Sequence, residues 1–198
     1  RGADYDIYQT IPYGELCVEL RGYCQEKNVN TLLHAIVALK EAGYDLSEEA
    51  VRSGFANVCR LTGLMGRWQQ LNDYPRLVCD TGHNIGGFSY IVPQLLAQPC
   101  KRLRIVFGMV NDKDIRGVLR LMPKDATYYF CQASVARALE SNTLQVVAGE
   151  FGLQGRAYST VEAATETALS EADAEDFIYV GGSSFVVADL LAGYFNSR

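Results

Sequence analysis

The feature that most constrains the fold is a repeated alternation of short β-rich runs and amphipathic segments in the second half of the chain. Five runs have the apolar and aromatic content of strands: RLVCD at 76–80, RLRIVFG at 102–108, ATYYFCQ at 126–132, GRAY at 155–158 and DFIYVGG at 176–182. Helices are expected near 86–97, 114–121, 134–150, 160–171 and 184–194. Strands separated by helices of this length imply right-handed crossovers and a mostly parallel sheet covered on both faces. The sequence therefore predicts a doubly wound α/β domain from about residue 70 onward.

The first part of the chain predicts an extended pair followed by two helices. YDIYQT and GELCVEL are the extended runs, and apolar residues then recur at helical spacing over 29–39 before Gly43. Ser47 is placed to cap a second helix over 47–58. The stretch 60–73 is expected to be a loop. This part is too short to close a core by itself, so we expect it to complete another domain.

Composition excludes several classes of partner. The 198 residues are 48% hydrophobic and carry a net charge of −5, so the chain has no basic field that would hold nucleic acid. No apolar run approaches the roughly 20 residues that a membrane helix needs. The six scattered cysteines are typical of reduced, buried thiols, and with only two histidines, His34 and His83, we expect no metal site within this chain. We therefore expect a cytoplasmic protein that binds neither nucleic acid nor a membrane.

The run LVCDTGHNIGG places Asp80, His83 and Asn84 directly after a predicted strand. In open parallel sheets, ligands bind outside the carboxyl ends of the strands, where helix N-termini point their N–H groups. The Asp80 carboxylate can accept hydrogen bonds from sugar hydroxyls or steer a cation, and His83 can stack on a base, so the turn suits a nucleotide. The alternative is that Asp80 and Asn84 only cap the turn and the following helix. The glycines do not form G-x-G-x-x-G, which disfavours a dinucleotide-dependent dehydrogenase.

Three further polar positions each have a functional and a structural interpretation. Arg67, in G-R-W, offers a fork of donors that matches phosphate oxygens, and the adjacent Trp68 can pin its loop. The alternative is a surface arginine beside a packing aromatic. Asp114 and Ser183 are both placed to cap helices, although the turn around Ser183 also offers N–H groups to an anion. Phe185 stands where a nucleophile elbow needs glycine, which disfavours a serine hydrolase.

The order of the motifs is more specific than any of them alone. The runs LRGYCQEKNVNTLLHAI, GLMGRWQQL, LVCDTGHNIGG, RIVFGMVNDKDIRGVLRLMP, FCQASVARAL and YVGGSSFVVADLL together resemble the C-terminal portion of the folylpolyglutamate synthase/dihydrofolate synthase branch of the Mur ligase family. The resemblance covers nearly the whole chain. Gly82 stands where that family more often has alanine, Phe185 where tyrosine is common, and Ala136 where a proline often precedes the arginine matching Arg137.

The resemblance implies a domain division, an activity and a set of ATP-binding residues. Residues 1–66 would be the C-terminal part of a central ATP-binding domain, and 67–198 a Rossmann-like domain of the Mur ligase C-terminal type. The family joins L-glutamate to dihydropteroate or folate, using ATP to form an acyl phosphate. By resemblance, the residues that bind ATP are Asn28 at the adenine, Arg67 at the phosphates, Asp80 beside the ribose and phosphates, and His83 near the base, with Asn28 opening its helix.

The sequence lacks the P-loop G-x-x-x-x-G-K-[ST], and in the family that loop and the Mg²⁺ ligands belong to earlier domains. We therefore expect this chain to have no catalytic residue of its own and to be inactive alone. Because its first twenty residues read as the middle of a fold, we also expect a fragment of something longer, and we expect it to act as a monomer. ATP and Mg²⁺ are the expected cofactors, with the metal ligands outside this chain. The alternatives are a non-catalytic nucleotide-binding or interaction module, and another Mur-type ligase that acts on a cell-wall precursor.

Overall fold

The computed structural model describes residues 5–196, and the chain divides into two compact units, Arg1–Arg67 and Trp68–Arg198. No helix within the described residues is long and apolar enough to cross a membrane. All six cysteines are free thiols. Only Cys79 and Cys131 are buried, however, and Cys100 is exposed, so the expectation that the thiols are buried is wrong for the other four.

The first unit contains a hairpin and three helices. The hairpin pairs β1 (Asp6–Thr10) with β2 (Gly14–Val18) antiparallel, and the helices are α1 (Gln25–Glu41), α2 (Glu48–Ala56) and α3 (Val58–Thr62). The predicted extended pair and the two helices are confirmed. Ser47 Oγ accepts a hydrogen bond from Ala50 N–H, which is the expected cap of α2. The core consists of six buried side chains: Tyr13, Leu16, Val18, Val29, Val51 and Phe55.

The first unit also has an apolar pocket of about 340 Å³ that is open on one side. Side chains of β2, α1 and α2 line it, among them Val29 and Phe55. Along α1, Leu32, Val37 and Leu39 are each at least 42% exposed. The first unit therefore buries only one side of α1.

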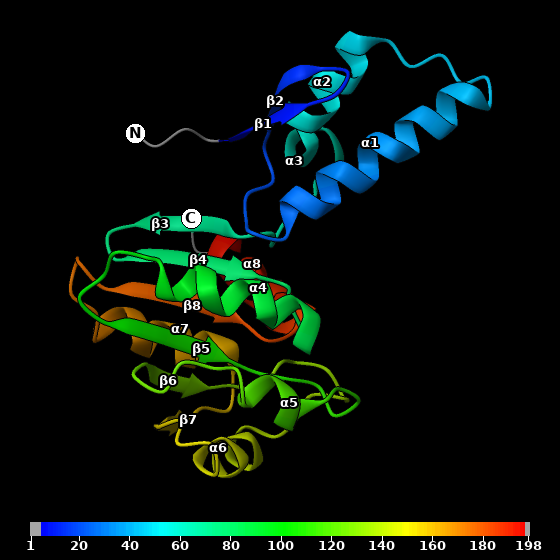
Figure 1. Ribbon diagram of the computed structural model, residues 1–198. Helices are drawn as coiled ribbons and strands as arrows, with labels where there is room; N and C mark the ends of the chain where they lie inside the picture. The colour runs from blue at the N-terminus through cyan, green and yellow to red at the C-terminus, as the bar shows by residue number, and fades with distance from the viewer. Residues whose placement is uncertain (1–4, 197–198) are drawn as a thin grey trace. The chain divides into compact units, whose positions relative to one another are not determined.

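The second unit is built on a six-stranded sheet with the order β3-β4-β8-β5-β6-β7 (Figure 1). The strands are β3 (Gln69–Asp73), β4 (Arg76–Asp80), β5 (Leu103–Phe107), β6 (Thr127–Phe130), β7 (Gly155–Ala157) and β8 (Phe177–Gly181). β3 pairs antiparallel with β4, and every other neighbouring pair is parallel. The predicted mixed, mostly parallel sheet is confirmed.

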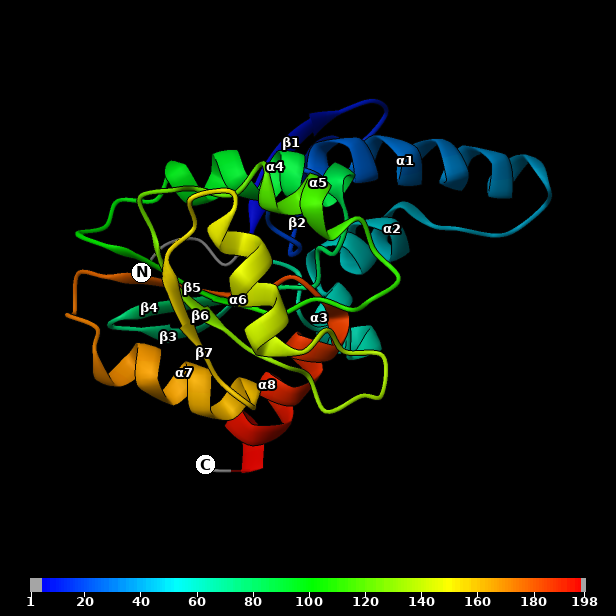
Figure 2. The same cartoon turned by 90° about the horizontal axis from the view of Figure 1, so that it is seen from below.

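Two layers of helices cover the sheet. Figure 2 shows α4 and α5 on one side of the strands and α7 and α8 on the other. Consecutive strand residues alternate between the layers: Val78 and Tyr179 pack with α4, α5 and α6, whereas Cys79 and Val180 pack with α7 and α8. Burial on both faces explains why these strands are almost continuously apolar. The helices are α4 (Ile85–Leu96), α5 (Ile115–Leu119), α6 (Ser141–Gly149), α7 (Val161–Ser170) and α8 (Ser184–Asn196).

The structure corrects two expectations about secondary structure. The stretch 60–73 is not a loop, because α3 continues to Thr62 and β3 occupies Gln69–Asp73. As a polar edge strand with a bulge between Gln70 and Asn72, β3 lacks the apolar alternation by which a strand is recognised. The predicted helix over 134–150 is also too long, since α6 begins only at Ser141.

Residues 134–140 are not helical because their backbone pairs with the loop after β5. Leu139 N–H donates to Met109 O at 2.8 Å, and Asn111 N–H donates to Arg137 O at 3.0 Å. Glu140 then caps α6, accepting from the backbone N–H groups of residues 142 and 143. These tertiary hydrogen bonds outweigh the helical propensity of the alanine-rich run.

Candidate functional site

The carboxyl ends of the parallel strands meet at one edge of the sheet, and Asp80 is the last residue of β4 at that edge. Its Oδ2 accepts a hydrogen bond from Trp68 N–H at 2.8 Å, and its Oδ1 accepts from Gly82 N–H at 2.8 Å. These contacts are the turn-capping role that the sequence left open. The role of Asp80 in binding ATP stays a prediction.

His83 lies on the same turn, at the start of α4. Its Nδ1 lies 3.0 Å from Thr81 O, and because a carbonyl only accepts, Nδ1 is the donor of this hydrogen bond. Asn84 Oδ1 accepts from Gly87 N–H at 2.8 Å, which confirms the expected cap of α4. The turn thus presents an imidazole beside the positive end of a twelve-residue helix.

Gly82 is tightly enclosed. A Cβ at this position would lie 2.3 Å from Ile91 Cδ1 and 3.2 Å from Asp80 Oδ1. An alanine, the residue the family more often has here, would require Ile91 to change its rotamer. Glycine at this position therefore matches the packing of α4 against the turn.

Trp68 anchors the segment that follows Arg67. Its indole is only 9% exposed and stacks on Phe177, with ring centroids 6.2 Å apart. It also contacts Tyr179 at a centroid distance of 6.2 Å. The backbone of Trp68 has φ of 45°, a left-handed conformation that costs a non-glycine residue about 1 kcal/mol or more. The expectation that this tryptophan pins its loop is confirmed.

The other two predicted ATP-binding residues belong to the first unit. Arg67 is exposed. Asn28 is also exposed, and its Nδ2 donates to Gln25 Oε1 at 3.0 Å. Because α1 begins at Gln25, Asn28 lies within its first turn, and the expectation that Asn28 opens the helix is wrong. The structure brings Asp80 and His83 together on one turn, and the convergence of Asn28 and Arg67 with them stays a prediction.

A second polar cluster lies at the carboxyl edge, after β5 and β6. Arg137 Nη1 lies 3.3 Å from Asp112 Oδ2, and the Arg137 guanidinium stacks 4.7 Å from the centroid of the Phe185 ring. Lys113 Nζ lies 4.0 Å from the same oxygen of Asp112. No role was predicted for this cluster, because residue 137 was expected within a helix and its partners are distant in the chain.

Asp114 and Ser183 have the capping roles that the sequence favoured. Asp114 Oδ1 accepts from Gly117 N–H at 2.8 Å at the start of α5. Ser183 is buried, and its Oγ accepts from Phe185 N–H at 3.2 Å at the start of α8. Both side chains are engaged by the helix that follows them.

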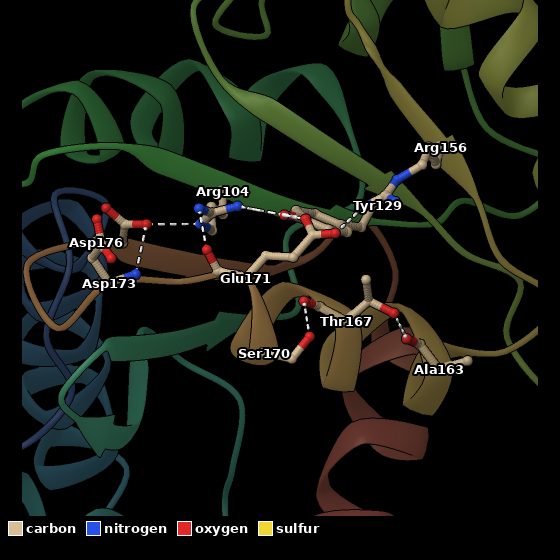
Figure 3. Close-up of polar contacts among 9 residues, drawn as sticks. All are labelled: Arg104, Tyr129, Arg156, Ala163, Thr167, Ser170, Glu171, Asp173 and Asp176. Carbon is tan, nitrogen blue, oxygen red and sulfur yellow. Dashed lines mark hydrogen bonds and ion pairs between the residues drawn. The ribbon is translucent and has the colours of Figure 1, made fainter.

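The most buried charges lie at the opposite, amino edge of the sheet (Figure 3). Arg104 donates from Nε to Asp176 Oδ2 at 2.8 Å and from Nη1 to Tyr129 Oη at 2.6 Å. Tyr129 in turn donates to Glu171 Oε2 at 2.7 Å, and Glu171 also pairs with Arg156. Each charged group thus has an oppositely charged partner within the network.

The pKa values of this network follow from its contacts. Burial by itself would lower the pKa of Arg104, but the bonds to Asp176 and Tyr129 outweigh it and raise that pKa. Burial raises the pKa of Tyr129 to about 12, and its bond to Glu171 adds to the effect. The bond from Arg156 holds the pKa of Glu171 below its usual value. The contacts of the network thus favour a charged Arg104, a neutral Tyr129 and an ionised Glu171.

The chemistry of the donor groups gives no Mg²⁺ site in the part of the chain that the structure describes. Among residues 5–196, no three side chains of His, Cys, Asp or Glu converge on a point that could hold a metal ion. A divalent cation at a triphosphate needs such oxygen ligands or the phosphates themselves. The residues described here therefore do not fit a resident metal.

Comparison with known proteins gives consistent matches. Residues 66–184 match the family model of the Mur ligase glutamate ligase domain. The dihydrofolate synthase/folylpolyglutamate synthase of Escherichia coli (strain K12) is 30% identical over 158 residues, which cover 79% of this chain and 36% of that protein. This chain therefore spans about a third of the length of that relative.

Solved structures of several related enzymes are also similar to this chain. E. coli FolC in complex with DHPP and ADP has a TM-score of 0.76 and 26% identity, over 100% of this chain and 47% of that one. The Yersinia pestis bifunctional folylpolyglutamate synthase/dihydrofolate synthase complexed with AMPPNP and Mn ion has a TM-score of 0.72 and 26% identity, over 98% of this chain and 47% of that one. With the sheet order, the turn after β4 and the family match over more than half of its length, the chain belongs to the Mur ligase family and contains its glutamate ligase domain.

Proposed function

We propose that the chain is the C-terminal part of an ATP-dependent ligase that joins L-glutamate to dihydropteroate or folate. The family match over 66–184 and the names of the similar proteins support this assignment. Residues 1–66 then complete a central ATP-binding domain, and 67–198 form the glutamate ligase domain. The reaction transfers the terminal phosphate of ATP to the substrate carboxylate. The amino group of glutamate attacks the resulting acyl phosphate and displaces inorganic phosphate.

The observation that carries the proposal is the turn after β4. It presents the Asp80 carboxylate, the His83 imidazole and the N-terminus of α4 at the carboxyl edge of a parallel sheet. Carboxylate oxygens accept from ribose hydroxyls, an imidazole stacks on a base, and helix N–H groups face anions. Asn28 reads the adenine and Arg67 reaches the phosphates in this proposal. ADP and AMPPNP in the two similar structures support a nucleotide site.

The second cluster at this edge suits the amino acid. Arg137, which is exposed, and Lys113, which is partly exposed, supply two cations that match the two carboxylates of L-glutamate. Asp112, between them, supplies the negative charge that attracts an ammonium group. The proposal therefore places ATP at the turn after β4 and L-glutamate at Arg137. Mg²⁺ would be held by polypeptide other than this chain, because the described residues do not fit it.

The proposal is tested in the natural enzyme with Arg67→Ala and Asp80→Ala. We expect kcat/KM for ATP to fall by about tenfold or more in each, which corresponds to about 1.4 kcal/mol of lost transition-state binding. Arg76→Ala is the matched control for Arg67, because Arg76 is an exposed arginine at the amino end of β4. Asp73→Ala is the control for Asp80. Wild-type kinetics in both test variants would refute the assignment.

The chain of 198 residues gives a second test by itself. It has no P-loop, so we expect no ATP-dependent coupling of L-glutamate to folate, even at high protein concentration. Measurable formation of the glutamyl product by this chain would contradict the proposal. The readout is chromatographic detection of the glutamylated folate.

A further inference from the structure

The loop 131–140 carries Arg137 from the end of β6 to the start of α6 without regular secondary structure. Two side chains of α8 hold it. Phe185 and Asp189 are four positions apart, so they lie on the same face of that helix. Phe185 stacks under the Arg137 guanidinium, and Asp189 contacts Ser134.

Asp189 grips the start of this loop with both carboxylate oxygens. Its Oδ2 accepts from Ser134 N–H at 2.7 Å, and its Oδ1 accepts from Ser134 Oγ–H at 2.7 Å. Both bonds are short and charge-assisted, and hydrogen bonds of this kind are the stronger ones in proteins. A partly exposed carboxylate on a helix is solvated by water without such partners. The effect of these two bonds is therefore to hold Ser134 and the start of the loop.

The far end of the loop is held as well. Arg137 O accepts from Asn111 N–H at 3.0 Å, and Ala138 forms an isolated antiparallel bridge with Val110. The loop is thus held at Ser134 and again at 137–138, and the Arg137 side chain extends from it over the Phe185 ring. The backbone on both sides of Arg137 is therefore fixed before any ligand arrives.

We propose that Asp189 is a positioning residue for amino-acid binding: by clamping Ser134, it orders the loop that presents Arg137 to a substrate carboxylate. The proposal rests on the function proposed above, in which Arg137 binds L-glutamate. A side chain that is ordered beforehand loses less conformational entropy on binding, so the clamp lowers the KM for the amino acid. Asp189 does not touch the substrate.

The kinetic test uses Asp189→Asn and Ser134→Ala in the natural enzyme. The Asn variant loses the charge and one acceptor, and the Ala variant loses only the hydroxyl donor, at an exposed position where folding is retained. We expect the KM for L-glutamate to rise by about fivefold in Asp189→Asn and by less in Ser134→Ala, with the KM for ATP within about twofold of wild type. Asp173→Asn is the control, because it removes an equal charge from the amino edge.

A double-mutant cycle tests whether Asp189 acts through Arg137. In the Arg137→Ala background, adding Asp189→Asn should leave the KM for L-glutamate unchanged, since no guanidinium remains to be positioned. A further increase equal to that in the wild-type background would overturn the proposal. If Arg137→Ala alone leaves this KM unchanged, Arg137 does not bind glutamate and the proposal falls with that assignment, whereas the ATP site is tested separately by Arg67 and Asp80.

Amide hydrogen exchange of residues 131–140 measures the ordering without any activity. We expect exchange at Ser134 to be about tenfold faster in Asp189→Asn than in the Asp173→Asn control. Equal exchange in the two variants would show that the clamp does not order the loop, and would overturn the proposal whatever the kinetics. Faster exchange with an unchanged KM for L-glutamate, while Arg137→Ala raises it, would overturn it too.

Discussion

Asp80 Oδ2 accepts a hydrogen bond from the backbone N–H of Trp68 at 2.8 Å. Gln69 and Cys79 are the last paired residues of β3 and β4 at this end of the sheet. The bond between Trp68 and Asp80, the next residue of each strand, extends that pairing by one position. The side chain at the end of β4 thereby fixes the residue that directly follows Arg67. In a ligase that closes over ATP, one carboxylate would then serve both the turn after β4 and the segment leading from the arginine.

Replacing Asp80 should release Trp68. In Asp80→Ala, the N–H groups of Trp68 and Gly82 lose their acceptor, which should lower the free energy of unfolding by about 1–3 kcal/mol. Trp68 is the only tryptophan, so its fluorescence reports the change directly. We expect an altered emission maximum in Asp80→Ala and a wild-type spectrum in Asp73→Ala. Identical spectra and stability in both variants would show that the bond is not formed.

Two tyrosines of the sheet should respond oppositely to loss of the hydroxyl. Tyr179 is fully buried and its hydroxyl has no hydrogen-bond partner among residues 5–196, so Tyr179→Phe should leave the stability unchanged or raise it by up to about 1 kcal/mol. The Tyr129 hydroxyl is bonded to Arg104 and Glu171, so Tyr129→Phe should cost about 1–3 kcal/mol. Urea unfolding of the two variants makes the comparison, and a larger loss in Tyr179→Phe would contradict it.

The parts of the fold that the sequence predicted are those with a local pattern. All five parallel strands were predicted, and four of them, β4, β5, β6 and β8, are short apolar runs because they are buried on both faces. β3 was missed because an edge strand has no such requirement. The start of α6 was misplaced because the backbone of 134–140 is hydrogen-bonded to residues near 110. Helix propensity is a local property and does not predict such pairing.

The same distinction holds for the site. The capping roles of Asn84, Asp114 and Ser183 were readable, since each acts within three residues of its own position. The pair Arg137 and Asp112 spans 25 positions. Asp189 and Ser134 span 55, and a single sequence gives no signal that links residues so far apart. Such contacts become visible only once the strand order is known.

Gly182 should be irreplaceable, because it has φ of +98° and its neighbours leave no space. A Cβ there would lie 2.5 Å from Gly108 O, a backbone atom that cannot move away by a change of rotamer. We expect Gly182→Ala to lower the free energy of unfolding by about 2 kcal/mol or more. Gly86→Ala, in the first turn of α4, is the control: its Cβ would meet only Asn84 Oδ1 at 3.5 Å, so the change should be neutral or stabilising by about 0.5–1 kcal/mol. Equal effects in denaturant titrations would contradict this explanation.

The cap of α6 should make the stability of the second unit sensitive to acid. Bonds from the hydroxyl and N–H of Thr143, and then from Asn142, hold the pKa of Glu140 at about 2, below its ordinary value of 4.5. Because the pKa is lowered in the folded state, the stabilisation is complete above the unfolded pKa and is lost as the pH falls from about 4.5 to about 2. Glu140→Gln does not titrate, so its stability should lack this part of the acid dependence.

Denaturant unfolding of wild type and Glu140→Gln between pH 7 and pH 2 measures this difference. We expect wild type to be the more stable at pH 7, with the difference shrinking as the pH approaches about 2, where the wild-type carboxylate gains its proton. Thr143→Val is the informative second variant: it removes the hydroxyl donor, so the pKa of Glu140 rises toward its ordinary value, and the loss of stability in acid is smaller and ends at a higher pH. A constant difference between wild type and Glu140→Gln across this range would mean that the carboxylate is not bonded to the start of α6, because only a group whose pKa changes on folding makes stability depend on pH.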